Sequence, residues 1–188
     1  RHYFFVNDTL NFDEKKNQLV WRGACHQPHR QAFVEKYYHH PLCNVGDSRK
    51  NAQGKPWGRS YMSVNEQLNY KFILSIEGND VATNLKWIMA SNSLCFMTRP
   101  KYETWFMEGT LKPNFHYVEL ADDYSDLEEK LIYYHQHPNE AKNIIENANN
   151  YVKPFLNKKQ EHLVGLLVMQ KYFEKTGQLA PSEQMLVK

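Results

Sequence analysis

Short apolar runs alternate with helical patterns from residue 18 to about residue 137, and this alternation limits the fold more than any other feature of the sequence. The runs that we interpret as buried strands cover residues 18–22, 41–46, 70–76, 94–97 and 116–120. Strands that alternate with helices form a parallel sheet whose connections pack on its faces. We therefore predict an α/β fold, a Rossmann-like parallel sheet with helices on both faces.

Local signals place the helices between and after these strands. A helical pattern opens at Pro28, because proline is tolerated in a first turn. The pattern Ser63-x-x-Glu66 matches the capping box that starts a helix, and the same pattern recurs from Ser125. Further helices are expected directly after the strand at 70–76, over 81–89, and over 102–107, from 138 onward and over 158–176.

The domain organisation follows from these elements. We expect a lead-in at 1–16, a Rossmann-like domain at 17–157, and a C-terminal helix and tail at 158–188. The first residue is Arg1 rather than Met, and no signal-peptide pattern follows it. We expect either that the start has been removed or that the chain belongs to a longer protein.

Composition excludes several classes of protein. The 23 Lys and Arg residues nearly balance the 21 Asp and Glu residues, which gives a formal net charge of +2. A dedicated nucleic-acid binder normally carries a strong basic excess, so we expect no nucleic-acid partner. No apolar run is long enough for a transmembrane helix. The three cysteines, Cys25, Cys43 and Cys95, fit free thiols in a reducing compartment.

The predicted carboxyl ends of the strands carry the candidate site. Ligands of such sheets bind beyond these ends, and residues 21–23, 77–80 and 97–103 are rich in polar side chains there. Gly78 would let a ligand approach the backbone, and the following helix start favours phosphate. Arg22, with Arg99 or Lys101, would neutralise a diphosphate. The alternative is ordinary turn chemistry at Gly78, since neither the G-x-G-x-x-G pattern nor a P-loop is present.

A second cluster of reactive side chains raises the possibility of zinc. Its members are Cys25, His26, His29, His39, His40 and Cys43. A helix of about ten residues separates the two groups by about 15 Å, too far for one tetrahedral ion. We therefore predict no metal site.

Several segments, in order along the chain, resemble glycosyltransferase family 90. They are LVWRG (19–23), YKFILSIEGND (70–80), NLKW (84–87), YETWF (102–106) and FHYV (115–118). The resemblance runs from about residue 17 to about residue 150 and is closest to the bacterial lipopolysaccharide glycosyltransferases.

The resemblance implies the C-terminal lobe of a GT-B enzyme. Such an enzyme transfers a sugar from a UDP-sugar donor to an acceptor hydroxyl, with inversion and without a metal or other cofactor. The general base is expected in an N-terminal lobe that would precede Arg1, so no catalytic residue is assigned here. The implied role is lipopolysaccharide or surface glycan biosynthesis on a glycan or lipid-linked acceptor. The implied location is the cytoplasm, with peripheral association at the inner face of the bacterial inner membrane. A non-catalytic module that binds a nucleotide or a partner is the alternative.

The family pattern also implies donor-binding positions. Arg22 would face the donor diphosphate, and Glu103 would reach the ribose. Many relatives carry arginine where this chain has Asn84, and asparagine cannot neutralise phosphate. Lys86, Arg22 or the basic loop at 49–59 would have to compensate. The full set of donor-binding candidates is Arg22, Gly23, Arg30, Gly78, Asn79, Asn84, Lys86 and Glu103.

Overall fold

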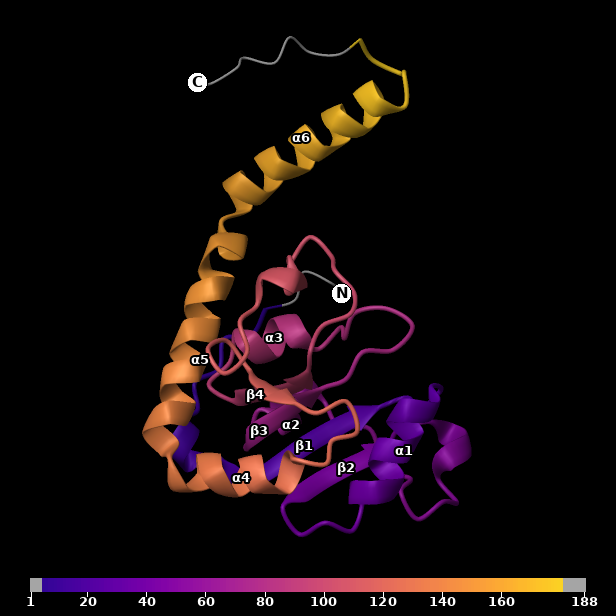
Figure 1. The fold of residues 1–188 in the computed structure, drawn as a ribbon, viewed down its shortest axis with the longest axis vertical. Helices are drawn as coiled ribbons and strands as arrows, with labels where there is room; N and C mark the ends of the chain where they lie inside the picture. The colour runs from indigo at the N-terminus through magenta and orange to yellow at the C-terminus, as the bar shows by residue number, and fades with distance from the viewer. Residues whose placement is uncertain (1–4, 181–188) are drawn as a thin grey trace. The chain divides into compact units, whose positions relative to one another are not determined.

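The computed structural model in Figure 1 describes residues 5–180. The chain divides into two compact units, Arg1–Val152 and Lys153–Lys188. The predicted end of the Rossmann-like domain at 157 differs from this division by the short turn η4 (Lys153–Leu156) and Asn157.

The first unit is built on one parallel five-stranded sheet. Its strands are paired in the order β2-β1-β3-β4-β5. They comprise β1 (Lys16–Gly23), β2 (Cys43–Asp47), β3 (Tyr70–Ser75), β4 (Leu94–Thr98) and β5 (Val118–Leu120). The predicted α/β, Rossmann-like parallel sheet is therefore confirmed.

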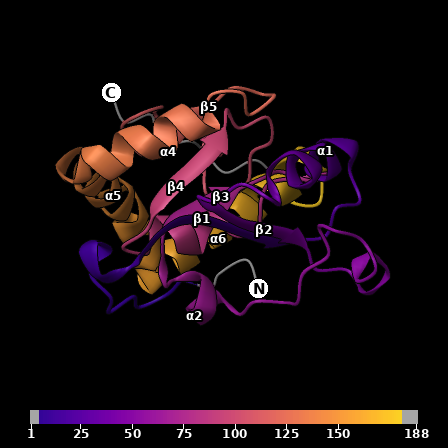
Figure 2. The same ribbon diagram turned by 90° about the horizontal axis from the view of Figure 1, so that it is seen from below.

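Helices cover both faces of this sheet. Figure 2 shows α1 and α4 on one side of the strands and α2 on the other. The helices of the first unit are α1 (Pro28–Tyr37), α2 (Val64–Gln67), α3 (Leu85–Met89), α4 (Leu127–Gln136) and α5 (Pro138–Val152), with 3-10 turns η1 (Phe12–Glu14), η2 (Lys50–Ala52) and η3 (Glu108–Thr110).

The core explains why the sheet forms where it does. Alternate residues of a strand point to opposite faces. Leu19 and Trp21 of β1 and Phe72 of β3 belong to the core cluster that also contains Phe33 of α1 and Leu131 of α4. Val20, between Leu19 and Trp21, is also fully buried, so β1 is covered on both faces. This double burial is typical of a parallel sheet.

The helix expected directly after β3 begins later than predicted. The chain first turns, because the amide of Gly78 donates to Asp80 O at 2.9 Å and the amide of Val81 donates to Asp80 Oδ1 at 2.7 Å. Asn84 then fixes the start of α3 by donating from Nδ2 to Leu74 O of β3 at 2.9 Å. The result is a five-residue helix that begins at Leu85, not at Val81.

Two other helix predictions are also wrong. Residues 102–107 form no helix, because Met107 has a left-handed backbone with φ of 53° and the carboxylate of Glu108 binds the amide of Thr104 at 2.7 Å. Ser125 is not the N-cap of α4. The N-cap is Asp126, whose carboxylate accepts a hydrogen bond from the amide of Ala121 at 3.0 Å. The capping box of Ser63 and Glu66 is confirmed at α2.

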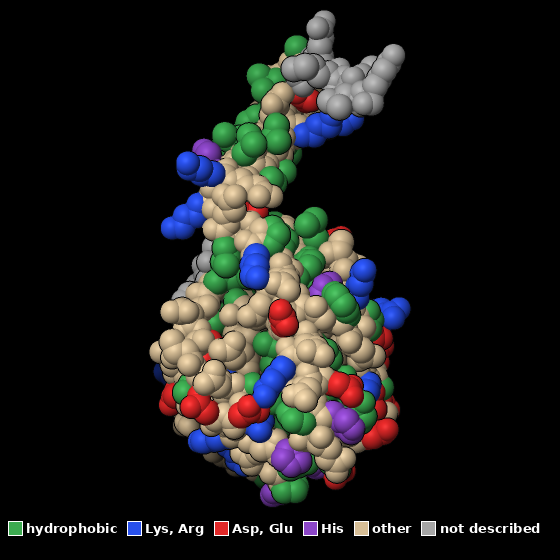
Figure 3. All heavy atoms as spheres, turned by 90° about the vertical axis from the view of Figure 1, so that its left-hand side faces the viewer, with side chains coloured by type: hydrophobic (Ala, Val, Ile, Leu, Met, Phe, Trp, Pro, Cys, Tyr) green, Lys and Arg blue, Asp and Glu red, His purple; other side chains and the backbone are tan. Residues whose placement is uncertain are grey.

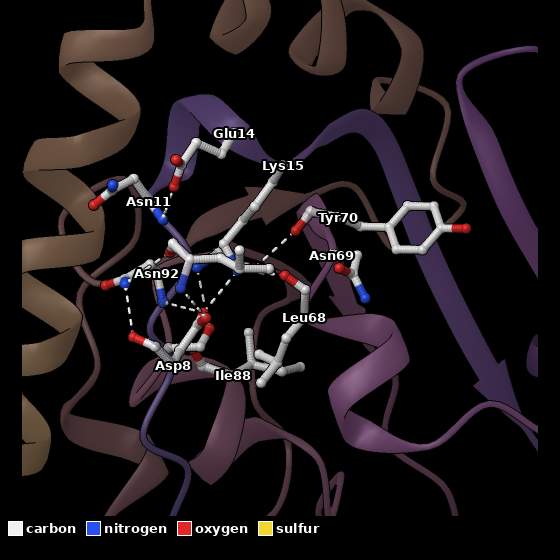
Figure 4. A network of polar contacts seen from close by, with 12 residues as sticks. Asp8, Asn11, Glu14, Lys15, Leu68, Asn69, Tyr70, Ile88 and Asn92 are labelled. Atoms are coloured by element: carbon white, nitrogen blue, oxygen red, sulfur yellow. Dashed lines mark hydrogen bonds and ion pairs between the residues drawn. The ribbon is translucent and has the colours of Figure 1, made fainter.

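The lead-in is fastened to the amino-terminal edge of the sheet by a buried ion pair (Figure 4). Lys15 Nζ lies 2.7 Å from Asp8 Oδ2, and the two side chains are 0% and 3% exposed. Lys15 also donates to Leu68 O before β3, and the Asp8 carboxylate accepts from the amide of Asn92 before β4 at 2.9 Å. Burial lowers the pKa of Lys15. The pair therefore joins three segments that are distant in sequence.

The second unit contains η4 and the long helix α6 (Lys158–Lys175). Asn157 caps the helix, because its side chain accepts from the amide of Gln160 at 3.2 Å. No residue of α6 is buried. Its central apolar side chains are exposed and fall on every side of the helix, so the helix has no single apolar stripe. Among residues 5–180, no helix is long and apolar enough to cross a membrane.

Candidate functional site

A pocket of about 260 Å³ opens at the carboxyl ends of β3, β4 and β5. We call it the strand-end pocket. Its position is the one at which parallel α/β sheets bind ligands. Its lining includes His29 of α1, Gly78 after β3, Thr98 at the end of β4, Lys101, Tyr102 and Tyr124.

The strand order also favours a ligand site at the carboxyl ends of the strands. The connection after β1 leads outward to β2, whereas β3, β4 and β5 follow on the other side of β1. The strand order therefore reverses between β1 and β3, although all strands stay parallel, and ligands of doubly wound sheets bind at such a switch point. The exits of β1 and β3 flank that point.

Arg30 of α1 spans the gap between these two exits. Its guanidinium donates to Ile76 O at 2.7 Å, to Glu77 O at 3.0 Å and to Ala24 O at 3.2 Å. Burial lowers the pKa of Arg30, but a guanidinium stays charged at any physiological pH. These bonds use three of its five N–H donors and leave positive charge beside the pocket.

Gly78 makes room for this arrangement. A Cβ atom at this position would lie 3.1 Å from Arg30 Nη2 and 3.5 Å from Gln27 Nε2. Glycine therefore lets the guanidinium approach the turn after β3. Asn79 strengthens the same junction, because its Oδ1 accepts from Gln27 Nε2 at 3.2 Å. The structure thus brings together three predicted site residues: Arg30, Gly78 and Asn79.

Glu77 joins the exits of β3 and β4. Its carboxylate accepts from the amide of Lys101 at 3.1 Å and from the amide of Tyr102 at 3.3 Å. On the α1 side, His29 Nε2 lies 2.9 Å from Glu77 O. One residue therefore holds two walls of the pocket through different atoms.

The charges that line the pocket are mixed. Lys101 Nζ lies 3.2 Å from Asp122 Oδ2, with both side chains more than half exposed, so solvent weakens this ion pair. Burial raises the pKa of Tyr124 to about 12, so its phenol remains a neutral donor. Because this ion pair is exposed, Lys101 can exchange Asp122 for an incoming anion.

Arg22 lies near this edge but faces away from it. Its neighbour Trp21 packs edge-on against Phe33 of α1 at 6.1 Å, so Arg22 points to the opposite face of the sheet. There Nη1 donates to Asn44 O and Nη2 donates to Asn44 Oδ1, both at 2.7 Å, while Nε donates to Ser60 O at 3.2 Å. Burial lowers the pKa of Arg22. The guanidinium is thus committed to β2 and the loop that follows.

Gly23 is a packing position at the end of β1. A Cβ atom there would lie 2.5 Å from the ring of Trp21. Glycine therefore allows the indole to lie flat beneath the exit of β1, where the guanidinium of Arg30 stands 5.9 Å from its ring centroid.

Lys86 is held in the interior rather than at the pocket. Its ammonium lies 2.8 Å from Glu108 Oε1 and 3.2 Å from Thr104 Oγ1, and the paired side chains are 2% and 1% exposed. Burial alone would raise the pKa of Glu108, but hydrogen bonds from Lys86 and Thr104 outweigh it and hold the pKa below its usual range. The local arrangement is that of a buried structural ion pair.

Asn84 and Glu103 also lie outside the lining of the pocket. Both functions of the Asn84 amide are used by β3, since Oδ1 accepts from Ser75 Oγ at 3.1 Å and Nδ2 donates to Leu74 O. Glu103 is exposed, with Oε1 3.2 Å from where a Cβ of Gly109 would stand. An arginine at position 84 would lose both bonds to β3.

The sequence indicated part of this pocket and missed the rest. Lys101 and Tyr102 lie in the segment 97–103 that was expected at the end of β4, and His29 was considered only in the cluster weighed for zinc, whereas Tyr124 was not assigned to any site. Tyr124 sits at the turn after β5 with φ of 57°, a conformation uncommon outside glycine. No pattern in the sequence predicts this left-handed conformation at Tyr124. Within the part of the chain that the structure describes, no three His, Cys, Asp or Glu side chains gather closely enough to hold a metal ion.

The fold and the pocket define a doubly wound α/β protein with its candidate site at the carboxyl edge of the sheet. Comparison with known proteins makes this class specific. The chain belongs to glycosyltransferase family 90, whose family model, Glycosyl transferase family 90, matches residues 5–177. The resemblance seen in the sequence is therefore confirmed.

Curated relatives include bacterial and animal proteins. O-glucosyltransferase LpsA of Dichelobacter nodosus is 53% identical over 173 residues, which cover 92% of this chain and 54% of the relative. Protein O-glucosyltransferase 3 of Homo sapiens is 29% identical over 107 residues, 56% of this chain and 21% of the relative. Protein O-glucosyltransferase 2 of Danio rerio is 28% identical over 96 residues, 51% of this chain and 19% of the relative. The chain spans about half the length of LpsA and less of the animal proteins.

Proposed function

We propose that this chain is the donor-binding lobe of an O-glucosyltransferase and that the strand-end pocket takes a UDP-sugar. The observation that carries the proposal is the pocket at the carboxyl ends of β3, β4 and β5, beside the junction that Arg30 holds. Three of the relatives are O-glucosyltransferases, which supports glucose as the sugar and oxygen as the accepting atom.

In this proposal the chain is the C-terminal lobe of a GT-B enzyme. A second, N-terminal lobe supplies the acceptor site and the general base. Its expected products are lipopolysaccharide or other surface glycans, with a glycan or lipid-linked acceptor. The work would take place at the cytoplasmic face of the bacterial inner membrane.

The proposed reaction is a single displacement. The acceptor hydroxyl oxygen attacks the anomeric carbon as the bond from that carbon to the UDP oxygen breaks. The bonding electrons leave with UDP, the hydroxyl proton passes to the general base, and the configuration at the anomeric carbon inverts. Negative charge therefore grows on the diphosphate in the transition state, and fixed donors at that place lower the barrier.

The residues of the pocket suit that task without a metal ion. Lys101 is exposed and can exchange Asp122 for a phosphate oxygen. His29 stands on the same side and Arg30 adds a fixed positive charge behind the Gly78 turn. Because the amide of Asn84 is bound to β3 and carries no charge, we assign the neutralisation of phosphate to Lys101.

Calorimetric titration with UDP in the presence of EDTA tests the proposal. We expect micromolar binding that survives EDTA, and a roughly tenfold weaker affinity in Lys101→Ala, equal to about 1.4 kcal/mol. Lys112→Ala is the matched control, since Lys112 is an exposed lysine in the segment before β5 and does not line the pocket. Absence of UDP binding, or binding only with a divalent metal, would overturn the proposal. UDP binding without glucosyl transfer by the whole protein would favour a non-catalytic module.

A further inference from the structure

A second cavity lies away from the strand-end pocket, between α4, α5 and the segment before β5. Its volume is about 510 Å³, within the size range of small-molecule sites. We call it the α4–α5 groove. It is lined by Asn114, Glu129 and Tyr133, by Asn143 and Asn147 of α5, and by two further residues of α4 and two of α5.

Side-chain amides dominate this groove. Within residues 5–180, the amides of Asn114, Asn143 and Asn147 form no hydrogen bond to protein, although each amide offers two donors and an acceptor. The carboxylate of Glu129 likewise forms no ion pair there. Asn114 is presented by a left-handed backbone with φ of 55°, in a turn closed by its own amide on Tyr117 O at 2.7 Å. Groups from three segments therefore face one space where no protein group binds them, so a ligand can replace the water that solvates them.

The charges of the groove disfavour an anion. Glu129 and Glu140 contribute two carboxylates, and Lys130 is the only basic residue of the lining. Lys130 is already occupied, because its Nζ lies 2.5 Å from Asp126 Oδ2 and donates also to Glu119 O. Figure 3 shows this side of the first unit, where charged side chains of both signs are interspersed and form no large patch of one sign. A phosphate or nucleotide would therefore meet net negative charge.

The amide-rich lining also disfavours an apolar ligand, which would leave these groups without partners. A neutral polyhydroxylated molecule satisfies them, because each hydroxyl both donates and accepts. Tyr133, which is 42% exposed, adds an aromatic surface for the C–H faces of a sugar ring. Its hydroxyl donates to Glu140 Oε2 at 2.9 Å and its ring stacks on His137 at 4.1 Å, so its position is fixed. We propose that the α4–α5 groove binds a neutral glycan.

This site would be separate from the donor pocket. α4 begins near the end of β5, where Asp126 binds the amide of Ala121, and runs back toward the amino edge over about 15 Å. Asn114 precedes β5 and lies at that amino edge as well. A glycan in the groove would therefore leave the strand-end pocket open. This is expected for a site that binds a glycan at a distance from the end of the glycan that reacts.

Nuclear magnetic resonance of the ¹⁵N-labelled chain tests the inference directly. Maltotriose, cellotriose, lactose and chitobiose are titrated in turn while the side-chain amide signals of Asn114, Asn143 and Asn147 are followed. We expect at least one of these sugars to shift the three signals together, with a single dissociation constant. UDP is titrated separately and is expected to leave these signals in place, which distinguishes this groove from the strand-end pocket.

The decisive variant is Asn143→Ala combined with Asn147→Ala. Neither residue is buried, and alanine favours the helix, so we expect an unchanged fold by circular dichroism. The affinity for the sugar, measured from the shift of the Asn114 side-chain amide signal, should fall at least tenfold. Asn139→Ala, on the same helix but outside the lining, is the control and should bind normally. The inference is overturned if none of the four sugars shifts these amides, or if the double variant binds as well as the unaltered chain.

Discussion

Replacing Lys86 by methionine distinguishes a structural lysine from a donor-binding one. In the structure its ammonium lies 2.8 Å from Glu108 Oε1, and both side chains are almost fully buried. Methionine keeps an unbranched side chain but removes the charge, so Glu108 loses its cationic partner. Removal of one member of a buried ion pair lowers the free energy of unfolding by about 3–5 kcal/mol.

The loss in the free energy of unfolding depends on pH, because it depends on the charge of Glu108. The hydrogen bonds from Thr104 to Glu108, at 2.7 and 2.8 Å, remain in the variant and place the loss near the lower limit, about 3 kcal/mol at neutral pH. In the unaltered chain the pKa of Glu108 is depressed, so its contribution is present at neutral pH and is lost as the pH falls through that pKa. In the variant the pKa of Glu108 rises, so its carboxyl is protonated more readily. The free-energy cost of protonating it falls by about 1.4 kcal/mol for each unit by which the pH is lowered. The stability difference should therefore narrow as the pH is lowered toward 5.

Urea denaturation of Lys86→Met and of the unaltered chain, followed by circular dichroism at neutral and at mildly acidic pH, measures this difference. The double variant Lys86→Met/Glu108→Gln should recover most of the loss, because no buried charge remains. Lys112→Met serves as the exposed control. An unchanged unfolding free energy in Lys86→Met, together with a loss of UDP affinity, would show that Lys86 acts on the donor and refute the structural reading.

Two further predictions concern the core of the first unit. Arg30→Lys cannot span Ala24 O, Ile76 O and Glu77 O at once, so we expect a loss of about 2 kcal/mol in the free energy of unfolding; an unchanged urea midpoint would contradict this role. Burial raises the pKa of Cys25 and of Cys43 to about 12, so both thiols should react with a disulfide reagent at mildly alkaline pH far more slowly in the native chain than in urea. Equal rates in the two conditions would disprove the burial of these thiols.

Periodicity predicted the sheet well because each strand is short, apolar and followed by a clear break. It failed at α3, where Asp80 looks like a helix start but uses its side chain on the amide of Val81. The late start is set by a contact between Asn84 and β3, and no local pattern records a contact of that kind. It failed again at 102–107, where Met107 has a left-handed backbone and the next residue, Glu108, is buried in an ion pair with Lys86.

The candidate site was predictable in position but not in detail. The carboxyl edge follows from topology, so Gly78 and Lys101 were identified from sequence. Which arginine reaches Gly78 depends on the face of the sheet that each side chain occupies. Arg22 and Arg30 are chemically equivalent in the sequence, and only the packing of Trp21 against α1 places them on opposite faces.

The three carbonyl oxygens held by Arg30 have a mechanical consequence. They belong to the segments that leave β1 and β3, so neither segment can shift without breaking bonds that also restrain the other. A molecule that displaces α1 would release both loops in one event, and a molecule that braces α1 would stiffen both. The two loops at the mouth of the pocket should therefore move together when a ligand binds. Their amide hydrogens should exchange with solvent at a common rate.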